Sequence, residues 1–552
     1  LGARKVPTVL GRDGLLMQAR APLFLRENAH ECLRTRTGLT SHVGGTIAPR
    51  TAWLLLRGHI MMRHAFDVLV IVLCSTSVYA QAGPPASEPE RPTYEDRRFD
   101  EDWSALRDVD LSGRNRVWER LKFIPLGQEE QVWLTLAGQA RERAEYYNQD
   151  QFGQSQPRQS GGFLLSRFRL SADLHASKYV RVFAEGKSSL QTNSDLSGGN
   201  GAGFVDRIDL QNAFADVVIP LGDPAALTLR GGRQELLFGV QRLVGPSDWT
   251  NVRRTFQGVS GIVDAGGWRF TPMWAELVVV DPHKFDEATP DNKLYGVYAS
   301  GAATKAVTAD LYWLGVDNRS TTFNGTSGRE RRQTIGGRLW RGRAALTAPE
   351  PRSTHQPPVH QSPGSAGTDF DLEAAVQFGT LGGEDIRAWM ITANAGHTFA
   401  SRLDPRPFVT MDFASGDDAP AGRVGTFNQL YPTNHTYLGA IDYVGRQNIL
   451  SPSGGVSLRP MSRLSVVMTQ FLFWRASVHD ALYGNSGTVM RPGTTTNARY
   501  VGTETDLIAT YRFDRHVLGY ASYNHFFPGD FIRATGPDRG SDYVYGALQY
   551  TF

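Results

Sequence analysis

The chain has 552 residues, of which 41% are hydrophobic and 20% are charged, and its formal net charge is +3. It is too polar for a bundle of membrane-spanning helices and too rich in aromatic residues and glycine for a disordered protein. Both cysteines, Cys32 and Cys74, precede residue 81, which excludes structural disulfides and cysteine-ligated metals from the rest of the chain.

Residues 61–80 have the pattern of a secretory signal peptide. An apolar run extends from Phe66 to Cys74, and small residues follow it up to Ala80, after which we expect cleavage. A lipoprotein signal at Cys74 is the alternative, but Leu73 stands where such processing needs a small residue. The signal peptide predicts export from the cytoplasm.

Residues 1–60 are expected to be an overcalled extension, with translation starting at Met61 or Met62, because a long polar leader would hinder recognition of the signal. Residues 1–80 hold ten basic and four acidic side chains, so the remainder has 48 basic and 51 acidic ones and a net charge of −3. The basic balance of the whole chain therefore implies no nucleic-acid partner.

Residues 81–130 form the next region, which begins rich in Pro and Glu. Leu106 and Trp118 are sparse apolar positions that follow the stretch Phe99–Trp103. We expect this region to be a periplasmic extension that leads into a β-barrel at residues 131–552.

From residue 131 onward, segments of about ten residues alternate apolar and polar side chains, as transmembrane β-strands require. In residues 164–175, for example, Phe168 and Leu170 alternate with Arg167 and Arg169. One face of such a strand meets lipid and the other meets water. The predicted strands are 131–147, 163–175, 179–190, 207–218, 226–238, 256–265, 268–280, 293–301, 305–315, 332–341, 369–379, 386–399, 406–414, 449–459, 463–475, 499–512, 516–525 and 541–552.

Connection lengths favour a barrel over a β-sandwich, because long and short linkers alternate along the chain. The predicted fold is all-β: a transmembrane antiparallel up-and-down β-barrel of about eighteen strands, with short periplasmic turns and long extracellular loops. An even number of strands places both termini in the periplasm. Two linkers break the alternation, since 380–385 is short where a long loop is expected and the insertion 342–368 is long where a turn is expected.

The last residues of the chain have the pattern of a closing strand. Val544, Gly546, Leu548, Tyr550 and Phe552 share one face, which predicts contact with outer-membrane lipid. Chain ends of soluble proteins are usually frayed and polar, so a terminal aromatic residue strengthens the prediction. We expect the barrel-assembly machinery to recognise this strand.

Arginines recur at positions that face the predicted lumen. Arginine is always charged and its planar fork matches carboxylates, so an arginine wall would favour anionic solutes. A second interpretation is equally open: the arginines pair with inward acidic residues and fill the interior. The arginines are Arg141, Arg143, Arg167, Arg169, Arg181, Arg230 and Arg338. The inward acidic residues are Glu145, Asp173, Glu185, Asp371, Glu373, Glu504 and Asp506.

Enzymatic motifs are weak or absent, so we expect no enzyme, cofactor or resident metal. The sequence has no GxSxG, HExxH or Walker motif, and Gly199–Gly203 lacks the strand-to-helix context of a nucleotide-binding loop. His355 and His360 lie in a Pro-rich linker and are a weak metal candidate. A hydrolase whose catalytic residues are scattered along the chain stays open as an alternative.

Several sequence segments, taken in their order along the chain, resemble the alginate-export family of outer-membrane barrels. They are Phe99–Arg107, Trp118, Leu121–Leu126, Leu136–Arg143, Gly232–Leu236, Phe238, Gly239, Arg242–Gly245, Asp248, Trp249, Asn251, Ala414–Asp417, Gly425–Thr433, His435, Tyr437, Leu438, Gly439 and Asn524–Phe531. The resemblance implies an eighteen-stranded barrel with an arginine-lined pore, and loosely implies a polyuronate substrate. It also implies that Arg141, Arg143 and Arg233 lie in the pore, although Arg233 needs a bulge at Gly231 and Gly232 to point inward.

The expected function is therefore passive conduction of an anionic saccharide or organic acid through the outer membrane. Two alternatives stay open, an outer-membrane hydrolase and a structural or adhesive barrel with a plugged lumen.

Overall fold

The computed structural model describes residues 92–107, 109, 117–127, 132–192, 194–196, 203–222, 225–342, 366–418, 422–493 and 495–552. The expected leader, the signal peptide with its cleavage site, and most of the 342–368 insertion with His355 and His360 lie outside the described residues. No helix in the described ranges is long and apolar enough to cross a membrane.

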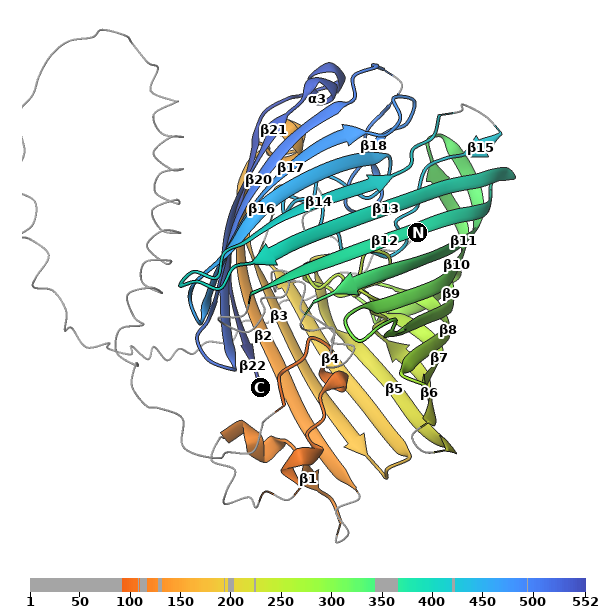
Figure 1. Cartoon of the computed structure of the whole chain (residues 1–552), viewed down its shortest axis with the longest axis vertical. Coiled ribbons are helices and arrows are strands. Elements are labelled where there is room, and N and C mark those ends of the chain that lie inside the picture. Colours follow the sequence, from red (N-terminus) through yellow and green to blue (C-terminus); the bar gives the residue numbers. More distant parts are fainter. Residues whose placement is uncertain are drawn as a thin grey trace, which may run out of the picture. The chain divides into compact units, whose positions relative to one another are not determined.

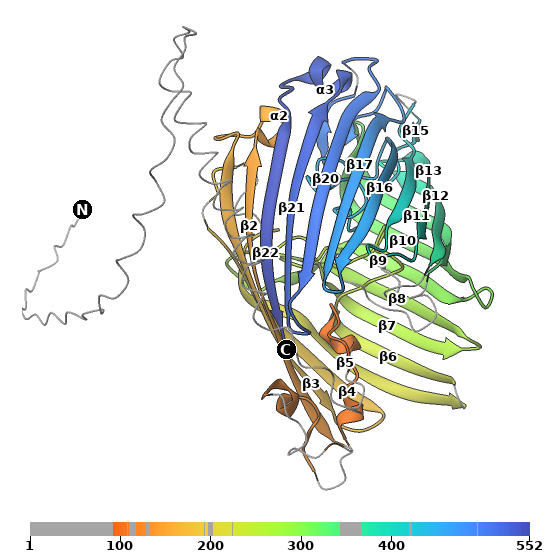
Figure 2. The same ribbon diagram turned by 60° about the vertical axis from the view of Figure 1, so that its left-hand side comes forward.

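Eighteen antiparallel strands form a closed barrel in the described part of the chain, as predicted. Each strand pairs with its neighbour, and the last strand pairs with the first from Gln139 opposite Thr551 to Asn148 opposite Asp542 (Figure 2). The barrel strands are β2 (Trp133–Asn148), β3 (Gly161–His175), β4 (Val180–Gln191), β5 (Asp206–Gly222), β6 (Ala225–Gln234), β7 (Phe256–Ala265), β8 (Trp268–Val279), β9 (Glu287–Ala302), β10 (Thr308–Phe323), β11 (Thr326–Arg341), β12 (Gly367–Leu381), β13 (Glu384–Thr398), β14 (Arg406–Ala414), β16 (Ile449–Met461), β17 (Leu464–Arg475), β20 (Tyr500–Arg512), β21 (Val517–Pro528) and β22 (Ser541–Thr551).

Short elements decorate the two ends of the barrel. At the end with long loops lie α2 (Asp150–Gly153), β15 (Arg423–Val424), β18 (Leu482–Tyr483), β19 (Val489–Arg491) and α3 (Asp530–Thr535). At the end with short turns lie η2 (Arg98–Asp100), η3 (Ser104–Leu106), η5 (Val117–Leu121) and β1 (Ile124–Pro125), close to the C-terminus (Figure 1). We call these the long-loop end and the short-turn end.

The largest difference from the predicted strand boundaries lies in one connection, and a smaller one is that β9 begins six residues before the predicted 293. The predicted strands 305–315 and 332–341 leave residues 316–331 as a connection, but β10 and β11 extend through most of it to a tight turn at Asn324 and Gly325. Both turn residues have positive φ, 44° and 88°, which an Asn-Gly pair adopts readily. The misleading signal was polarity: these strand ends are polar because they project past the apolar belt. The short connection predicted between 380 and 385 is confirmed by the β12–β13 turn.

The two faces of each strand differ as the alternation predicts. On β3, Leu164, Phe168 and Leu170 are 40–66% exposed on the outside, whereas Arg167 and Arg169 are buried inside. On β22, Leu548 is 51% exposed and Tyr545 is buried. An apolar outer face with polar residues inside is the arrangement that lipid outside and polar contacts inside require.

The N-terminal extension packs against the short-turn end of the barrel. Leu106 lies in a small apolar cluster with Trp103, Phe123 and Trp133. Phe99 makes edge contacts with the inward rings of Phe183 on β4 and Phe214 on β5, at centroid distances of 5.5 and 5.1 Å. The extension is therefore docked into the barrel, and its residue Phe99 enters the lumen.

The C-terminal residue is part of this docking. The ring of Phe552 stacks on Trp118 at 4.2 Å, and its backbone exchanges two hydrogen bonds with Gly138 on β2. A Cβ atom at Gly138 would lie 2.5 Å from the Phe552 ring, so only glycine leaves room for it. The carbonyl oxygen of Phe552 also accepts a hydrogen bond from buried Arg98. The last strand and the extension therefore stabilise each other.

Several ionisable groups of the extension lie in unusual surroundings, among them Lys122 and Asp96. Burial, together with the nearby guanidinium group of Arg98, lowers the pKa of Lys122 to about 7. Burial and the carboxylate of Asp248 raise the pKa of Asp96 to about 6. Docking of the extension should therefore depend on pH.

The first prediction concerns topology. The chain beyond residue 80 has no cysteine, so single cysteines can be labelled selectively. Gln159→Cys and Asp418→Cys, both exposed at the long-loop end, should react with an impermeant maleimide on intact cells. Lys178→Cys at the short-turn end should react only after the outer membrane is permeabilised. Leu438→Cys should stay unlabelled, because Leu438 is buried although it lies in a long loop. Equal labelling of Gln159→Cys and Lys178→Cys would contradict the topology.

The second prediction concerns assembly. Deleting Phe552 should lower the yield of heat-modifiable barrel in the outer membrane, because both its stacking and its pairing with Gly138 are lost. Gly138→Leu should act similarly by displacing the ring, whereas Trp118→Ala removes the stacking alone. A full yield of folded barrel without Phe552 would show that the terminal aromatic residue is dispensable.

The third prediction concerns pH. Docked Asp96 keeps its proton up to about pH 6 rather than 3.8, so raising the pH through that window weakens docking. Docked Lys122 loses its proton near pH 7 rather than 10.5, so a further rise strengthens docking. Undocking of the extension can be followed with a fluorophore attached at Thr93→Cys. The urea concentration needed for undocking should be lowest near pH 6 to 7.

Two variants separate the contributions to this profile. Asp96→Asn should reduce the fall in docking strength on the acid side, to which Glu101 also contributes because burial raises its pKa. Lys122→Met should remove the rise on the alkaline side. A wild-type profile that is flat between pH 4 and 10 would refute both assignments.

Candidate functional site

Neighbouring strands place four of the predicted arginines together on the inner wall. Arg141 and Arg143 lie on β2, and Arg167 and Arg169 lie on β3, with Arg141 directly opposite Arg167 in the ladder. All four side chains are at most 2% exposed. The patch predicted from alternation therefore exists, and it is covered from the lumen side.

Strand-borne carboxylates neutralise most of the predicted arginines. The guanidinium groups lie within hydrogen-bonding distance of carboxylates, on an adjacent strand in most pairs and on the same strand for Arg143 and Glu145, so the network interpretation is well supported. The pairs are Arg143 with Glu145 at 2.6 Å, Arg169 with Glu185 at 2.8 Å, Arg181 with Asp173 at 2.7 Å, Arg230 with Asp216 at 2.7 Å and Arg338 with Asp371 at 2.6 Å.

The loop between β6 and β7, residues 235–255, crosses the lumen between opposite walls. At one side, Arg242 of this loop binds Asp371 and Glu373 on β12, each at 2.8 Å. At the other side, Asp248 binds the arginine patch on β2 and β3. β12 is about half a circumference from β2 and β3 in the strand order. We call residues 235–255 the crossing loop.

Asp248 places a carboxylate between two wall arginines. Its Oδ1 accepts a hydrogen bond of 2.8 Å from Arg167, and its Oδ2 lies 3.6 Å from Arg141 Nη1. Its backbone carbonyl accepts hydrogen bonds from both guanidinium groups, at 2.9 Å from Arg141 and 3.1 Å from Arg167. Arg253 of the same loop also pairs with Asp248. The patch thus binds a carboxylate that belongs to a loop and not to the wall.

Aromatic stacking fixes the crossing loop beside this carboxylate. The Arg143 guanidinium lies 3.9 Å from the centre of the Trp249 ring, and His435 stacks on Trp249 at 3.7 Å. His435 belongs to the loop 415–448, which is anchored in turn to β20: Glu504 accepts the backbone N–H of Ile441 at 2.9 Å. Loops therefore fill much of the lumen at the long-loop end.

The extension occupies arginines at the opposite end of the lumen. The backbone carbonyl of Asp96 accepts a hydrogen bond from Arg169, and that of Phe99 accepts one from Arg181 at 2.7 Å. Arg230 lies over the Phe99 ring at 4.8 Å. Four strands that carry predicted arginines, β2, β3, β4 and β6, are thus covered by the crossing loop or by the extension.

Arg233 does not follow the expectation of a bulge. The β5–β6 register is continuous from Arg230 to Arg233, so no extra residue turns its side chain inward. Its side chain is 12% exposed, and its guanidinium group binds Asp209 at 2.8 Å and the carbonyl of Asp286 at 2.6 Å, near the rim. A place for Arg233 in the pore stays a prediction.

A cluster of three buried carboxylates, Asp206, Asp209 and Asp286, lies at the same rim. Lys187 pairs with Asp206 at 2.7 Å and with Asp286 at 2.9 Å, and Arg233 pairs with Asp209. These cations supply the positive charge that a metal ion would otherwise provide, so the cluster is an ion-pair network.

Sequence reasoning missed the crossing loop as a lumenal element. Asp248 and Trp249 stood out as motif residues, but without a role inside the barrel. One signal was available: Leu243, Val244 and Val252 are apolar, which is unusual for a solvated loop, and all three are buried. The lumenal arginines Arg332, Arg406, Arg446 and Arg475, all fully buried, were also missed.

The chain is similar to a known protein family and to several solved structures. A family model described as alginate export matches residues 132–546. No curated protein sequence matches the chain. Among solved structures, OpdO of Pseudomonas aeruginosa is 11% identical with a TM-score of 0.50, covering 76% of this chain and 97% of that one. OccAB2 of Acinetobacter baumannii is 10% identical with the same TM-score, covering 76% and 98%.

The similarity to these solved structures shows a shared fold. At 10–11% sequence identity it supports no conclusion about substrate or mechanism. The family match covers about three quarters of the chain and nearly the whole barrel. The chain therefore belongs to the alginate export family and is an outer-membrane β-barrel of the channel type.

Proposed function

We propose that this channel passes an anionic saccharide rich in uronate units, passively, and that the arginine patch on β2 and β3 binds its carboxylates. The observation that carries the proposal is the carboxylate of Asp248 between Arg141 and Arg167. A site that holds one carboxylate has the donors for another, because guanidinium groups bind carboxylates through charge-assisted hydrogen bonds.

Because Asp248 lies on a loop, a substrate carboxylate can replace it at Arg141 and Arg167. Arg143 and Arg169 pair with carboxylates of the wall, which cannot leave. Asp248 lies on the crossing loop, so movement of that loop would uncover Arg141 and Arg167. A substrate carboxylate could then replace Asp248 without leaving either charge unpaired, which avoids the high cost of a bare buried charge. Within the described chain, buried Nε of Arg167 also lacks a hydrogen-bond partner and is a spare donor.

Transport in this proposal requires the crossing loop and the extension to move aside. Both cover the arginine patch, from the long-loop end and the short-turn end respectively. The lumen as described is the closed state of such a channel. The expected extracellular side is the long-loop end, and the expected periplasmic side holds both termini.

A plugged structural barrel is the second candidate, and the filled lumen favours it. A large apolar cluster includes loop residues Val244, Trp249 and Leu438 together with wall residues Tyr298 and Phe471. A barrel whose loops never leave this cluster would conduct no current. Conductance therefore separates the two functions.

The fourth prediction tests the carboxylate site. In planar bilayers, short oligouronates should block the wild-type current. Arg141→Gln combined with Arg167→Gln should raise the half-blocking concentration by at least about tenfold, because a hydrogen bond to a charged group contributes about 1.5–3 kcal/mol. Asp248→Asn should lower that concentration, since the internal competitor is weakened.

A matched control removes two charges outside the lumen. Arg269→Gln combined with Arg319→Gln alters two exposed, ion-paired arginines and should leave the block unchanged. Replacing Arg141, Arg143, Arg167 and Arg169 together by Gln should also reduce the anion preference given by reversal potentials. If the barrel conducts but these replacements change neither the block nor the reversal potential, the arginine site is refuted. If the folded wild-type barrel conducts no current, the plugged barrel is favoured.

A further inference from the structure

Exposed arginines gather on the outer face of the barrel at the long-loop ends of β10 to β13. Arg331 on β11 and Arg387 on β13 point outward and lie two strands apart. Arg423 on the short strand β15 is the strand-pairing partner of Asp385 on β13 and is also exposed. Arg329 and Arg319 extend the group and are ion-paired to Asp317 and Asp291. We call Arg331, Arg387 and Arg423 the outer arginine triad.

The triad is only partly neutralised: Asp317 lies opposite Arg331 in the β10–β11 ladder and Asp385 lies beside Arg423, but neither makes a close ion pair with these two arginines. The side chain of Arg387 is 70% exposed and its guanidinium group lies 3.7 Å from the carboxylate of Asp385, whose side chain is 64% exposed. Among the described residues, no carboxylate lies within 4 Å of the Arg331 or Arg423 guanidinium nitrogens. Exposed ion pairs of this kind contribute little, so the triad is available to an external anion.

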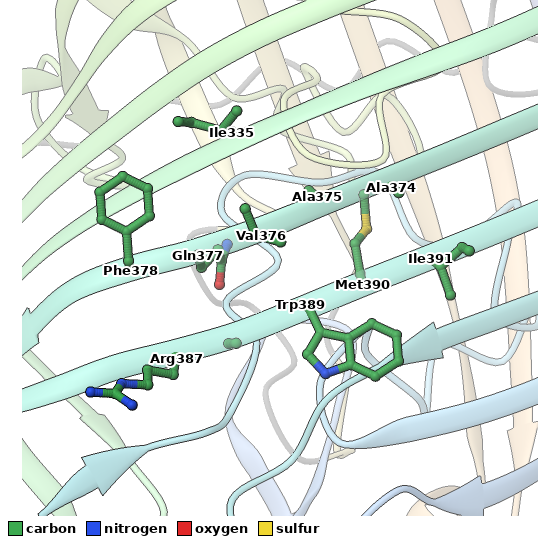
Figure 3. Close-up of a pocket in the computed structure, with 11 residues that line it drawn as sticks. Ile335, Ala374, Ala375, Val376, Gln377, Phe378, Arg387, Trp389, Met390 and Ile391 are labelled. Atoms are coloured by element: carbon green, nitrogen blue, oxygen red, sulfur yellow. The ribbon is translucent and has the colours of Figure 1, made fainter.

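An apolar groove lies directly below the triad. Val376 and Phe378 on β12 and Trp389 and Ile391 on β13 are 46–54% exposed and border it, and the small side chain of Ala374 leaves a depression between them. Arg387 lies opposite Phe378 in the ladder, at the same end of the groove (Figure 3). The groove therefore runs from the arginine level toward the middle of the membrane.

We propose that this face binds lipid A, the phosphorylated multi-acyl glycolipid of the outer leaflet, with its phosphates on the outer arginine triad and an acyl chain in the groove. Charge and position both select this occupant. Arginine forks bind phosphate through paired hydrogen bonds. The arginines stand where the apolar belt ends on the side expected to be extracellular, which is the level of the outer-leaflet phosphates.

The outer surface of β12 and β13 changes from charged to apolar along the strands. Moving from Arg387 toward the short-turn end, the outward residues of β13 become Trp389 and Ile391, and those of β12 become Val376 and Leu372. The boundary between charged and apolar side chains is thus sharp, as a lipid with an anionic head and apolar chains requires. The inference depends on the outer-membrane location alone and is independent of what the lumen transports.

The fifth prediction tests this binding. Fluorescent deep-rough lipopolysaccharide is titrated into the detergent-solubilised barrel, and anisotropy reports the dissociation constant. Each arginine near an anionic lipid layer strengthens binding about fivefold, so Arg331→Gln, Arg387→Gln and Arg423→Gln together should weaken it by about a hundredfold. The matched control is Arg269→Gln, Arg402→Gln and Arg463→Gln, three exposed arginines toward the short-turn end, which should bind like the wild type.

Two further arms use the wild-type barrel, so they do not depend on folding of a variant. Dephosphorylated lipopolysaccharide should bind far more weakly if the phosphates are recognised. Inorganic phosphate should compete poorly if an acyl chain is needed. Phosphatidylglycerol, with one phosphate and two acyl chains, should compete poorly if the several phosphates and acyl chains of lipid A are recognised together. Equal binding by the triple variant, or equal binding of the dephosphorylated lipid, would overturn the proposal. Full competition by phosphatidylglycerol would replace lipid A with a general anionic lipid site and would also overturn it.

Discussion

Pairing between β22 and β2 is the constraint on which the rest of the structure depends. Inside a bilayer an unpaired strand edge leaves N–H and C=O groups without partners, each at a cost of several kcal/mol, so the sheet must close. Closure joins the last residues of the chain to residues 139–148, about 400 positions earlier in the sequence. The contact of Phe552 with Gly138 and Trp118 continues this seam into the extension.

A closed barrel of eighteen strands encloses a wide interior, and that interior must be filled or hydrated. Here long-range polar contacts fill much of it. Wall arginines pair with wall carboxylates on the same or an adjacent strand, and the crossing loop connects β2 and β3 with β12 through Asp248 and Arg242. Buried charges tolerate this environment because they are paired and hydrogen-bonded. The lumen is thus an ion-pair network with a loop through its centre.

The network has fixed and movable parts, and this difference gives it functional meaning. Pairs between wall residues, such as Arg230 with Asp216, persist as long as the barrel is folded. Contacts made by Asp248, Trp249, Asp96 and Phe99 come from segments outside the wall, so they can open without breaking a strand ladder. A gated channel needs this division, because gating elements must be less stable than their scaffold.

The sequence alone determined the barrel, its number of strands, the lipid-facing stripe and the inward arginines, because side-chain alternation is local and has a period of two residues. Only the tertiary structure decided which loops enter the lumen. Arg141 meets the Asp248 carbonyl across 107 residues, and no periodic pattern encodes such a contact. The β10–β11 boundary was missed for a related reason: strand ends beyond the membrane lose the apolar face that identifies a strand. Alternation specifies which side a residue faces, whereas closure of the barrel decides what it meets there.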